Sequence, residues 1–553
     1  MMVSKTGKKL AVLVVVLITA AFSLSFIINQ ESRDFRIGKN LDIFFSFIRE
    51  LTTFYVDETD PEKIIRSAIE GVLRSLDPYT AYYSESELED FNFMTTGKYG
   101  GIGCLVRNNG DYAIVSEIYK GFPADAAGIR AGDIILKVDG EPLRGLTVDK
   151  VSEKLKGEPG TSVSVTLGRN GKEIEYTMKR ERIVLPPVPY YGMIDSVIGY
   201  IRFTNFTQNC YEDVKKALVE LKHFNPEGII LDLRSNPGGI MTEAVDVVNL
   251  FVGPGTEVVS TKGKVKQFDG IYKTKKQAVD EKIPLAVIVN RASASASEIV
   301  AGAIQDLDRG VIVGQRSFGK GLVQITRPLS FNAQLKVTTA KYYIPSGRCI
   351  QAHDFAHRNE DGSVGFIPDS LIKTFKTRNG RPVRDGGGIA PDLEVAPETL
   401  SQLATELYLK NYIFDFATRY YWTHPSIERP DRFTLTGKDY DNFIAFLKEK
   451  NFNYQTFTEK SFEELAENAR KEKYYDAAKD LFASLQKEIT HSLEKDLQNF
   501  RSEITEILTE EIIRRYYYEE GSIAWSVNND EQVRKAVEVL KNKSLYNSVL
   551  SGR

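Results

Sequence analysis

Histidine and cysteine are scarce in this chain, and their scarcity excludes several kinds of catalytic and metal site. The sequence of 553 residues contains 5 histidines and 3 cysteines. None of the histidines stands in a recognisable triad context, so the usual histidine base of a serine nucleophile is missing. The cysteines show no paired spacing, which gives neither a metal site nor a disulfide framework; they are Cys104, Cys210 and Cys349.

A strong net charge is also missing. The chain has 72 basic and 75 acidic residues, which leaves a formal net charge of −3. Proteins that bind nucleic acid or another polyanion usually carry a marked positive balance. Nothing in the composition therefore predicts a nucleic-acid partner.

The first 30 residues have the pattern of a targeting segment. Lys5, Lys8 and Lys9 precede the uncharged stretch Leu10–Ile28, which is followed by polar residues. The stretch is long enough to span a bilayer. Because no small-x-small cleavage site and no cysteine for lipidation follow it, we favour an uncleaved anchor over a cleaved signal peptide. Either interpretation places the rest of the chain outside the cytoplasm, in the periplasm or cell envelope.

Residues 290–324 carry the features that favour nucleophilic catalysis. The small residues Ala292–Ser297 lie between an apolar strand, Pro284–Val289, and a helical pattern, Glu298–Leu307. The first turn of a helix offers unpaired N–H groups to a developing anion, so a serine here is a candidate nucleophile. Lys320, in a Gly-Lys-Gly turn, is the nearest candidate base, because a desolvated lysine can be neutral and take a proton. The alternative is tight packing at a strand-to-helix turn followed by a surface hairpin.

A second glycine-rich turn lies upstream. It runs from Leu231 to Gly239 and again follows an apolar strand, Gly228–Leu231. Its glycines leave main-chain N–H groups bare, which is what an oxyanion hole requires.

Three segments together resemble the carboxyl-terminal processing (tail-specific) serine peptidases, over residues 40–400. The segments are the Asp-Leu-Arg-Ser-Asn-Pro-Gly-Gly turn from Asp232, the Ser-Ala-Ser-Ala-Ser-Glu run from Ser293, and the Phe-Gly-Lys-Gly-Leu-Val-Gln run from Phe318. All three occur in the order that the family shows. The resemblance implies proteolysis without a metal or an organic cofactor.

The resemblance also assigns roles residue by residue. The middle serine, Ser295, rather than Ser293 or Ser297, is the implied nucleophile, and Lys320 is its base. Asp306 matches an acidic position of the family, and we expect it to be a structural partner rather than a catalytic one. Gln324 is the residue implied to help hold the lysine. The implied oxyanion donors are the backbone N–H groups of Gly238 and Ala296.

Residues 93–183 resemble a PDZ domain. Short strands and turns alternate there, with Gly-Ile-Arg-Ala-Gly-Asp-Ile-Ile from Gly128 and a helical pattern at Val148–Leu155. In that fold a glycine-rich loop presents N–H groups to a terminal carboxylate, and the peptide adds a strand to the sheet edge. The resemblance assigns the carboxylate to the loop of Gly101, Ile102 and Gly103. The alternative is a glycine turn without a ligand.

The expected architecture is multidomain α/β, with a helical N-terminal arm, a mixed β/α PDZ domain, an α/β Ser–Lys peptidase core and a helical C-terminal domain. Apolar residues from Leu481 to Leu508 recur every three or four positions, which predicts one continuous helical stripe used in packing or self-association. Truncation after residue 400 is expected to change assembly and leave the dyad intact. The expected segments are 1–30 (signal or anchor), 38–92 (helical arm), 93–183 (PDZ), 186–400 (peptidase) and 401–553 (helical).

The function implied is a serine endopeptidase that cleaves exported proteins near their C-termini and recognises the free C-terminus through the PDZ domain. In the family, segments similar to the helical arm pack against a partner subunit, so we expect a homo-oligomer such as a dimer. Two other classes stay open. One is a Ser–Lys hydrolase of a non-peptide amide, and the other is a non-catalytic PDZ scaffold of the cell envelope.

Overall fold

The computed structural model describes residues 33–88, 96–359 and 361–552. The chain divides into two compact units, residues 1–82 and 83–553. The predicted anchor at residues 1–30 lies outside the described residues, and within the described ranges no helix is both long and apolar enough to cross a membrane.

The first unit contains a pair of helices, as predicted for the segment from residue 38. They are α2 (Arg33–Phe54) and α3 (Pro61–Arg74). Asp60 caps α3 by accepting hydrogen bonds from the N–H groups of Glu62 and Lys63, and Pro61 stands at the first helical position, where its missing N–H costs nothing. Neither helix has a fully buried side chain, and Phe45 on α2 is 68% exposed. Residues 81–83 then form a short strand, β1 (Ala81–Tyr83).

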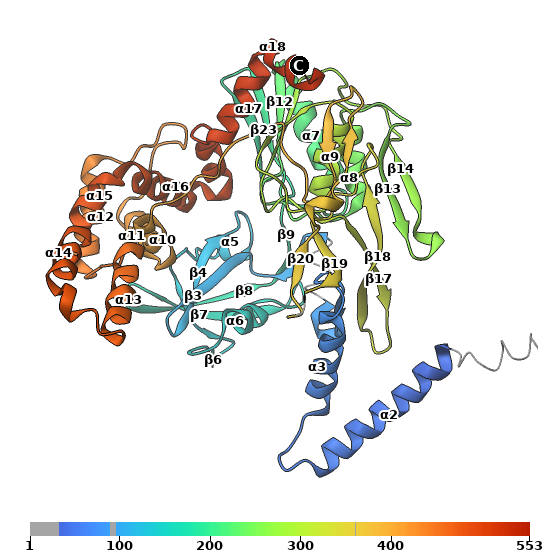
Figure 1. Cartoon of the computed structure of the whole chain (residues 1–553). Coiled ribbons are helices and arrows are strands. Elements are labelled where there is room, and N and C mark those ends of the chain that lie inside the picture. Colours follow the sequence, from blue (N-terminus) through green and yellow to red (C-terminus); the bar gives the residue numbers. More distant parts are fainter. Residues whose placement is uncertain (1–32, 89–95, 360, 553) are drawn as a thin grey trace, which may run out of the picture. The chain divides into compact units, whose positions relative to one another are not determined.

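In the second unit, the predicted PDZ segment forms a small mixed domain (Figure 1). Its main sheet has the order β3-β4-β5-β7-β8, with β6 beside β5, and a separate ribbon joins β2 to β9. Alternate residues on the strands, such as Val163, Val165 and Leu167 on β7, point into its core. The predicted helix Val148–Leu155 is confirmed as α6. The other elements are β2 (Lys98–Gly101), β3 (Cys104–Asn109), β4 (Tyr112–Ile118), α5 (Pro123–Ala126), β5 (Ile134–Val138), β6 (Glu141–Pro142), β7 (Ser162–Arg169), β8 (Lys172–Lys179) and β9 (Glu181–Val184).

The α/β alternation predicted after residue 186 is confirmed as a six-stranded sheet in the order β10-β11-β12-β15-β16-β23. β10 is antiparallel to β11, and the other pairs are parallel. The strands are β10 (Tyr190–Ile194), β11 (Ile198–Arg202), β12 (Gly228–Asp232), β15 (Leu285–Val289), β16 (Val311–Gly314) and β23 (Leu393–Glu394).

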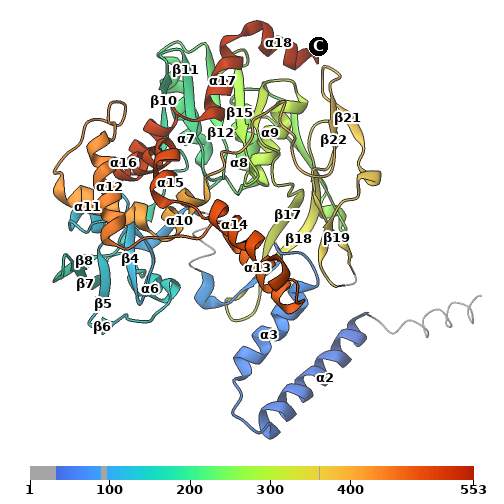
Figure 2. The same cartoon turned by 60° about the vertical axis from the view of Figure 1, so that its left-hand side comes forward.

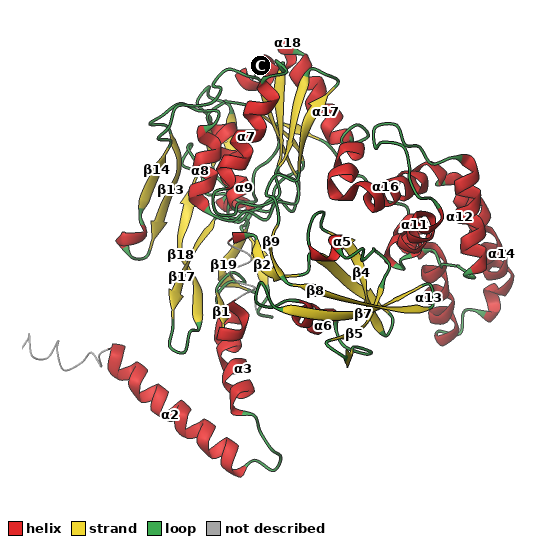
Figure 3. Cartoon of the chain, turned by 180° about the vertical axis from the view of Figure 1, so that it is seen from behind, coloured by secondary structure: helices red, strands yellow, loops and turns green. Residues whose placement is uncertain are grey.

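Helices cover both faces of this sheet, which is why β12 and β15 read as unbroken apolar runs (Figure 3). One face packs against α7 (Cys210–Lys222), α8 (Met241–Asn249) and α9 (Ala296–Asp306). The other face packs against the last two helices of the chain, α17 (Glu531–Lys541) and α18 (Lys543–Ser551).

An antiparallel sheet and two hairpins complete this region. β17 pairs with β18, β18 with β13, and β13 with β14. Residues 353–384 form two small hairpins, and Arg381 in the second of them is buried and pairs with Asp308 and Asp392. The strands are β13 (Glu257–Gly263), β14 (Gly270–Lys273), β17 (Leu322–Pro328), β18 (Gln334–Tyr343), β19 (His353–Arg358), β20 (Val364–Phe366), β21 (Thr374–Lys376) and β22 (Pro382–Arg384).

Residues from 402 to 526 form a helical region with a core of its own. The single long stripe predicted between Leu481 and Leu508 is wrong. The helices break near His491 and Phe500, and Leu481 is 75% exposed whereas Leu508 is buried. The break has a local cause, because Ser492 caps a new helix and His491 binds Glu459. The helices are α10 (Gln402–Leu409), α11 (Tyr412–Thr423), α12 (Gly437–Glu449), α13 (Phe457–Lys471), α14 (Lys479–Ile489), α15 (Leu493–Asn499) and α16 (Arg501–Ser526).

The segment after residue 526 leaves this helical core and joins the six-stranded sheet. Val533, Ala536 and Val539 of α17 are buried against apolar residues of the strands. In Figures 1 and 2 this end of the chain lies beside β12, which is some three hundred positions earlier in the sequence. A truncation after residue 400 would therefore expose one face of the sheet to solvent. This differs from the expectation that such a truncation leaves the dyad intact.

Candidate active site

Ser295 stands at the N-cap of α9, in an uncommon backbone conformation. Its φ and ψ are 55° and −113°. The side chains of the two neighbouring serines are fully buried: Ser293 Oγ donates to the carbonyl of Leu233 at 2.8 Å, and Ser297 Oγ donates to the carbonyl of Asn236 at 2.9 Å. Ser295 is only half-buried. Of the three serines it is therefore the one with a side chain that a substrate can reach, and strain of this kind is common at functional sites.

One buried carboxylate joins the Ser295 turn to the Lys320 turn. Glu298 Oε2 accepts hydrogen bonds from the N–H groups of Ser295 and Lys320, both at 2.8 Å. Glu298 Oε1 accepts from Ser317 Oγ and the Gly319 N–H, both at 2.6 Å. Burial raises the pKa of this carboxyl group, and the four donors offset part of that effect. The geometry thus fixes the two segments to each other through a side chain to which sequence reasoning gave no role.

The glycines on either side of Lys320 are required by close backbone packing. A Cβ on Gly319 would lie 2.4 Å from the Cβ of Ala352, and one on Gly321 would lie 2.8 Å from the backbone nitrogen of Gln351. The Lys320 side chain is half-buried. Gln324, four residues further along on β17, donates from its amide to Thr338 Oγ1 at 3.1 Å. The role of Gln324 in holding the lysine stays a prediction.

The predicted oxyanion turn lies directly against Ser295, the predicted nucleophile. A Cβ on Gly238 would lie 2.8 Å from both Ser295 Cβ and the backbone nitrogen of Ala296. Only glycine fits this approach, since Gly238 also has a φ of +96°. In this structure the Gly238 N–H donates to Asn236 Oδ1 at 2.9 Å. Among the described residues the Ala296 N–H has no acceptor, as is usual for the first residue of a helix.

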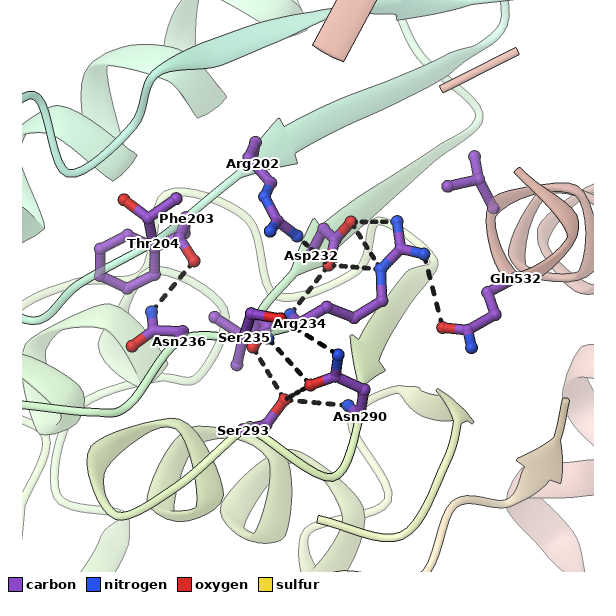
Figure 4. Close-up of polar contacts among 12 residues, drawn as sticks. Arg202, Phe203, Thr204, Asp232, Arg234, Ser235, Asn236, Asn290, Ser293 and Gln532 are labelled. Atoms are coloured by element: carbon purple, nitrogen blue, oxygen red, sulfur yellow. Dashed lines mark hydrogen bonds and ion pairs between the residues drawn. The ribbon is translucent and has the colours of Figure 1, made fainter. Parts of the chain in front are cut away.

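A cluster of charged residues closes the other side of this turn (Figure 4). Asp232, at the end of β12, is fully buried and contacts two guanidinium groups, those of Arg202 at 2.9 Å and Arg234 at 2.6 Å. Burial alone would raise the pKa of Asp232, but the two arginines hold it well below its usual range. Sequence reasoning quoted Asp232 and Arg234 only as part of a motif. The available signal was an acid at the end of an apolar strand, shortly before a glycine-rich turn.

The acidic position Asp306 lies at the end of α9 and is not part of this cluster. Its carboxylate accepts hydrogen bonds from Arg348 Nη2 at 2.9 Å and from the Ser346 N–H at 3.0 Å. This buried pair fits the structural role expected for Asp306.

No group of acidic, histidine and cysteine side chains that would suit a metal ion occurs within the described ranges.

The predicted carboxylate loop borders a groove in the second unit. A cavity of about 210 Å³ is lined by Gly101, Ile102 and Gly103, by Val106 of β3 and by residues of α6. In the part of the chain that the structure describes, β3 pairs only with β4, so its other edge is open. A cavity between an open strand edge and a helix is a geometry that a bound peptide strand can complete.

Comparisons with known proteins match three separate parts of the chain to protein families. Residues 114–169 match the PDZ domain, residues 197–372 match peptidase family S41, and residues 403–540 match the family described as "Probable PDZ-protease, C-terminal helical domain". The order of these matches is the order of the domains described above.

Curated relatives agree with the family matches. The chain is 36% identical over 342 residues to the "Carboxy-terminal-processing protease" of Bartonella bacilliformis. The matched residues make up 61% of this chain and 75% of that protein. It is 33% identical over 339 residues to a "Probable CtpA-like serine protease" of Staphylococcus aureus, with 61% and 66% covered. A solved "Photosystem II D1 C-terminal processing protease" is 27% identical, with 65% of this chain and 93% of that chain covered, at a TM-score of 0.35. From the coverage and identity of the Bartonella relative, together with the S41 and PDZ matches, the chain belongs to peptidase family S41, as a carboxy-terminal-processing serine protease with a PDZ domain.

Proposed function

We propose that this protein is a serine endopeptidase in which Ser295 is the nucleophile and Lys320 is the general base. The observation that carries this proposal is the carboxylate of Glu298, which binds the backbone N–H groups of both residues at 2.8 Å. An arrangement that fixes a half-buried serine and a half-buried lysine to one rigid group is what a catalytic dyad needs. The partial exposure of Ser295, beside two fully buried serines, supports the same assignment.

In the proposed reaction, Ser295 Oγ attacks the scissile carbonyl carbon while the neutral amine of Lys320 takes the hydroxyl proton. The ammonium then returns this proton to the leaving amine, and water releases the acyl group by the same route. The Ala296 N–H is open to receive the oxyanion, and the Gly238 N–H joins it once its hydrogen bond to Asn236 Oδ1 is exchanged for one to the oxyanion.

We propose further that the substrates are exported proteins that are cleaved near their C-termini. The free C-terminal carboxylate binds the N–H groups of the Gly101–Gly103 loop, and the peptide adds a strand to the open edge of β3. The N-terminal segment, with its lysines and apolar stretch, supports a location in the periplasm or cell envelope with a membrane anchor. The exposed apolar side chains of α2 support self-association.

The dyad is tested by three substitutions at its two residues and by two control substitutions, all in the full chain and assayed by cleavage of a labelled protein substrate. Ser295→Ala and Lys320→Ala each remove an essential group, and we expect both to lose several orders of magnitude in kcat. Lys320→Arg should be equally inactive, because a guanidinium does not deprotonate at working pH. Ser293→Ala and Ser297→Ala should keep part of the activity. Full activity of Lys320→Ala would refute the dyad.

The PDZ role is tested by peptide binding to the inactive Ser295→Ala protein, so that the peptide is not cut during the measurement. A peptide with a free C-terminal carboxylate should bind more tightly than the same peptide with an amidated C-terminus, because the loop N–H groups face an anion. Equal affinity for both forms would leave the groove without its proposed ligand. Comparing the C-termini of envelope proteins between wild-type and Ser295→Ala cells would then identify substrates.

A further inference from the structure

Arg234 links the oxyanion turn to a distant part of the chain. Its Nε and Nη2 atoms bind the carboxylate of Asp232 at 3.0 and 2.6 Å. Its Nη1 atom points the other way, to the carboxylate of Asp530 and to Gln532 Oε1 at 3.5 Å. Figure 4 shows the guanidinium group between Asp232 and Gln532. Arg234 thus spans from the end of β12 to the last helices of the chain.

Asp530 is itself held firmly. It is the N-cap of α17, and its Oδ1 atom accepts a hydrogen bond from the Val533 N–H at 3.0 Å. α17 packs against the central strands of the six-stranded sheet, where Leu540 lies against Gly228 at the start of β12. Because its own helix is anchored on the sheet, Asp530 is a fixed partner for Arg234 rather than a mobile surface acid.

The charges of this cluster balance only when Asp530 is included. Arg202 and Arg234 carry two positive charges, and Asp232 supplies one negative charge. Asp530 supplies the second negative charge. The side chain of Arg234 is 17% exposed and that of Asp530 is 23% exposed, so solvent screens the pair only in part. Removal of the Asp530 charge would leave Arg234 with one acid that it shares with Arg202.

Hydrogen bonds made by the residues after Arg234 connect the position of Arg234 to that of Ser295. The Ser235 N–H donates to Asn290 Oδ1 at 2.9 Å. The carbonyl of Asn236 accepts hydrogen bonds from the Ala294 N–H at 3.0 Å and from Ser297 Oγ at 2.9 Å. Two residues later, Gly238 lies against Ser295. A displacement of Arg234 therefore changes the distance between the oxyanion donors and the attacking oxygen.

We propose that Asp530 is a positioning residue for the peptidase reaction. From the C-terminal helix pair it holds Arg234, and through Arg234 it keeps the Asp232–Gly239 turn in register with Ser295. This inference rests on the proposed function, because the turn matters only if Ser295 is the nucleophile. Asp530 does not touch the reacting atoms. Its loss acts on the geometry of the oxyanion, and misplacement by about 1 Å at such a site reduces the rate by about 10²-fold.

The test is Asp530→Asn in the full chain. Asparagine caps helices as well as aspartate does, so α17 should keep its start while the negative charge that pairs with Arg234 is lost. We expect kcat to fall by about 10- to 100-fold while KM stays within about twofold, because substrate binding does not use this turn. Asp530→Glu restores the charge and should recover part of kcat. The matched control is Lys541→Gln, which breaks the exposed 3.1 Å pair of the same helix with Asp195 and should leave kcat unchanged.

Folding is measured in parallel by circular dichroism, and kcat is expressed per folded molecule. A wild-type kcat per folded molecule in Asp530→Asn would overturn the inference, as would a loss that appears only in KM. Ser295→Ala is assayed on the same substrate. If Ser295→Ala is active, the proposed function fails. If it is inactive while Asp530→Asn is normal, the failure concerns Asp530 alone.

Discussion

At the scale of single residues, the carboxylate of Glu298 is held in place by hydrogen bonds from two segments of the site. It accepts four hydrogen bonds from groups of two segments, and its side chain has no measurable exposure. The Ser-x-x-Glu spacing from Ser295 to Glu298 is the signature of a helix capping box. Here the same spacing also brings the acid to the Lys320 turn, which no local rule predicts.

Glu298→Gln is expected to reduce kcat by about 10²-fold, because an amide NH₂ would face N–H donors where an acceptor is needed and would displace the Ser295 or Lys320 turn. The measurement is steady-state cleavage of a peptide substrate together with thermal unfolding. Glu243→Gln is the matched control. Glu243, in the first turn of α8, also accepts hydrogen bonds from backbone N–H groups, but these belong to Asn209 and Tyr211 at the start of α7. Equal losses in both variants would argue against a specific role for Glu298.

Gly238→Ala is expected to abolish activity. The added Cβ would lie 2.7 Å from the carbonyl oxygen of Ala294 and 2.8 Å from Ser295 Cβ, so the Gly238 turn must move away from Ser295, the proposed nucleophile. Gly255→Ala is the control: Gly255 has a φ of +83° but open space around its Cα, so it should lose only about 1 kcal/mol of stability through backbone strain. An active Gly238→Ala enzyme would remove this turn from the mechanism.

At the scale of elements, a hydrogen-bonded pair between helices lies at the break between α14 and α15. His491 lies in the break between α14 and α15, and its Nδ1 atom binds Glu459 Oε1 of α13 at 2.8 Å. Burial alone would raise the pKa of Glu459, but the hydrogen bonds from His491 and Thr456 bring it down to about 2. The break in the predicted stripe therefore has a partner on another helix, which the periodicity of the sequence does not reveal.

This pair has a defined dependence on pH. Because the pKa of Glu459 is lowered in the folded protein from an ordinary 4.5 to about 2, its contribution to stability is complete above pH 4.5 and is lost as the pH falls towards 2. We expect the difference in unfolding free energy between wild type and Glu459→Gln, measured with urea, to shrink across this acid range. Glu467→Gln, which removes an exposed pair with Lys471 on the same helix, should show almost no difference at any pH. A constant difference for Glu459→Gln would contradict the assignment.

At the scale of the whole molecule, the peptidase sheet depends on the last residues of the chain. Leu540 of α17 is 2% exposed and packs on Gly228 of β12. Leu540→Ala should therefore lower the free energy of unfolding by about 2–5 kcal/mol, as expected for a buried leucine. Lys535→Ala, which removes a partly exposed ion pair with Glu538 on the same helix, should change it by less than about 1 kcal/mol. Denaturant unfolding monitored together with peptidase activity checks both values.

An unchanged free energy of unfolding in Leu540→Ala would mean that α17 contributes little to the stability of the sheet. If activity is instead lost together with stability, the peptidase domain depends on two separate stretches of chain. These are the sheet region and the C-terminal helices, with the long helical segment between them in the sequence.

The sequence by itself determined the central strands of the peptidase sheet and the segments from which the candidate site is built. The apolar runs at Gly228–Leu231 and Pro284–Val289 are β12 and β15, because strands buried on both faces must be apolar at every position. The segments around Ser295, Lys320 and Gly238 stood out because small residues and glycines permit close backbone approach.

Only the tertiary structure decided which groups meet. Glu298 reaches Lys320, and Asp530 reaches Arg234 across 296 positions of sequence. The same applies to α17, whose apolar face is visible in the sequence while its partner, the second face of the sheet, is not. The physical reason is that periodicity records which side of an element is buried and carries no information about the surface that buries it.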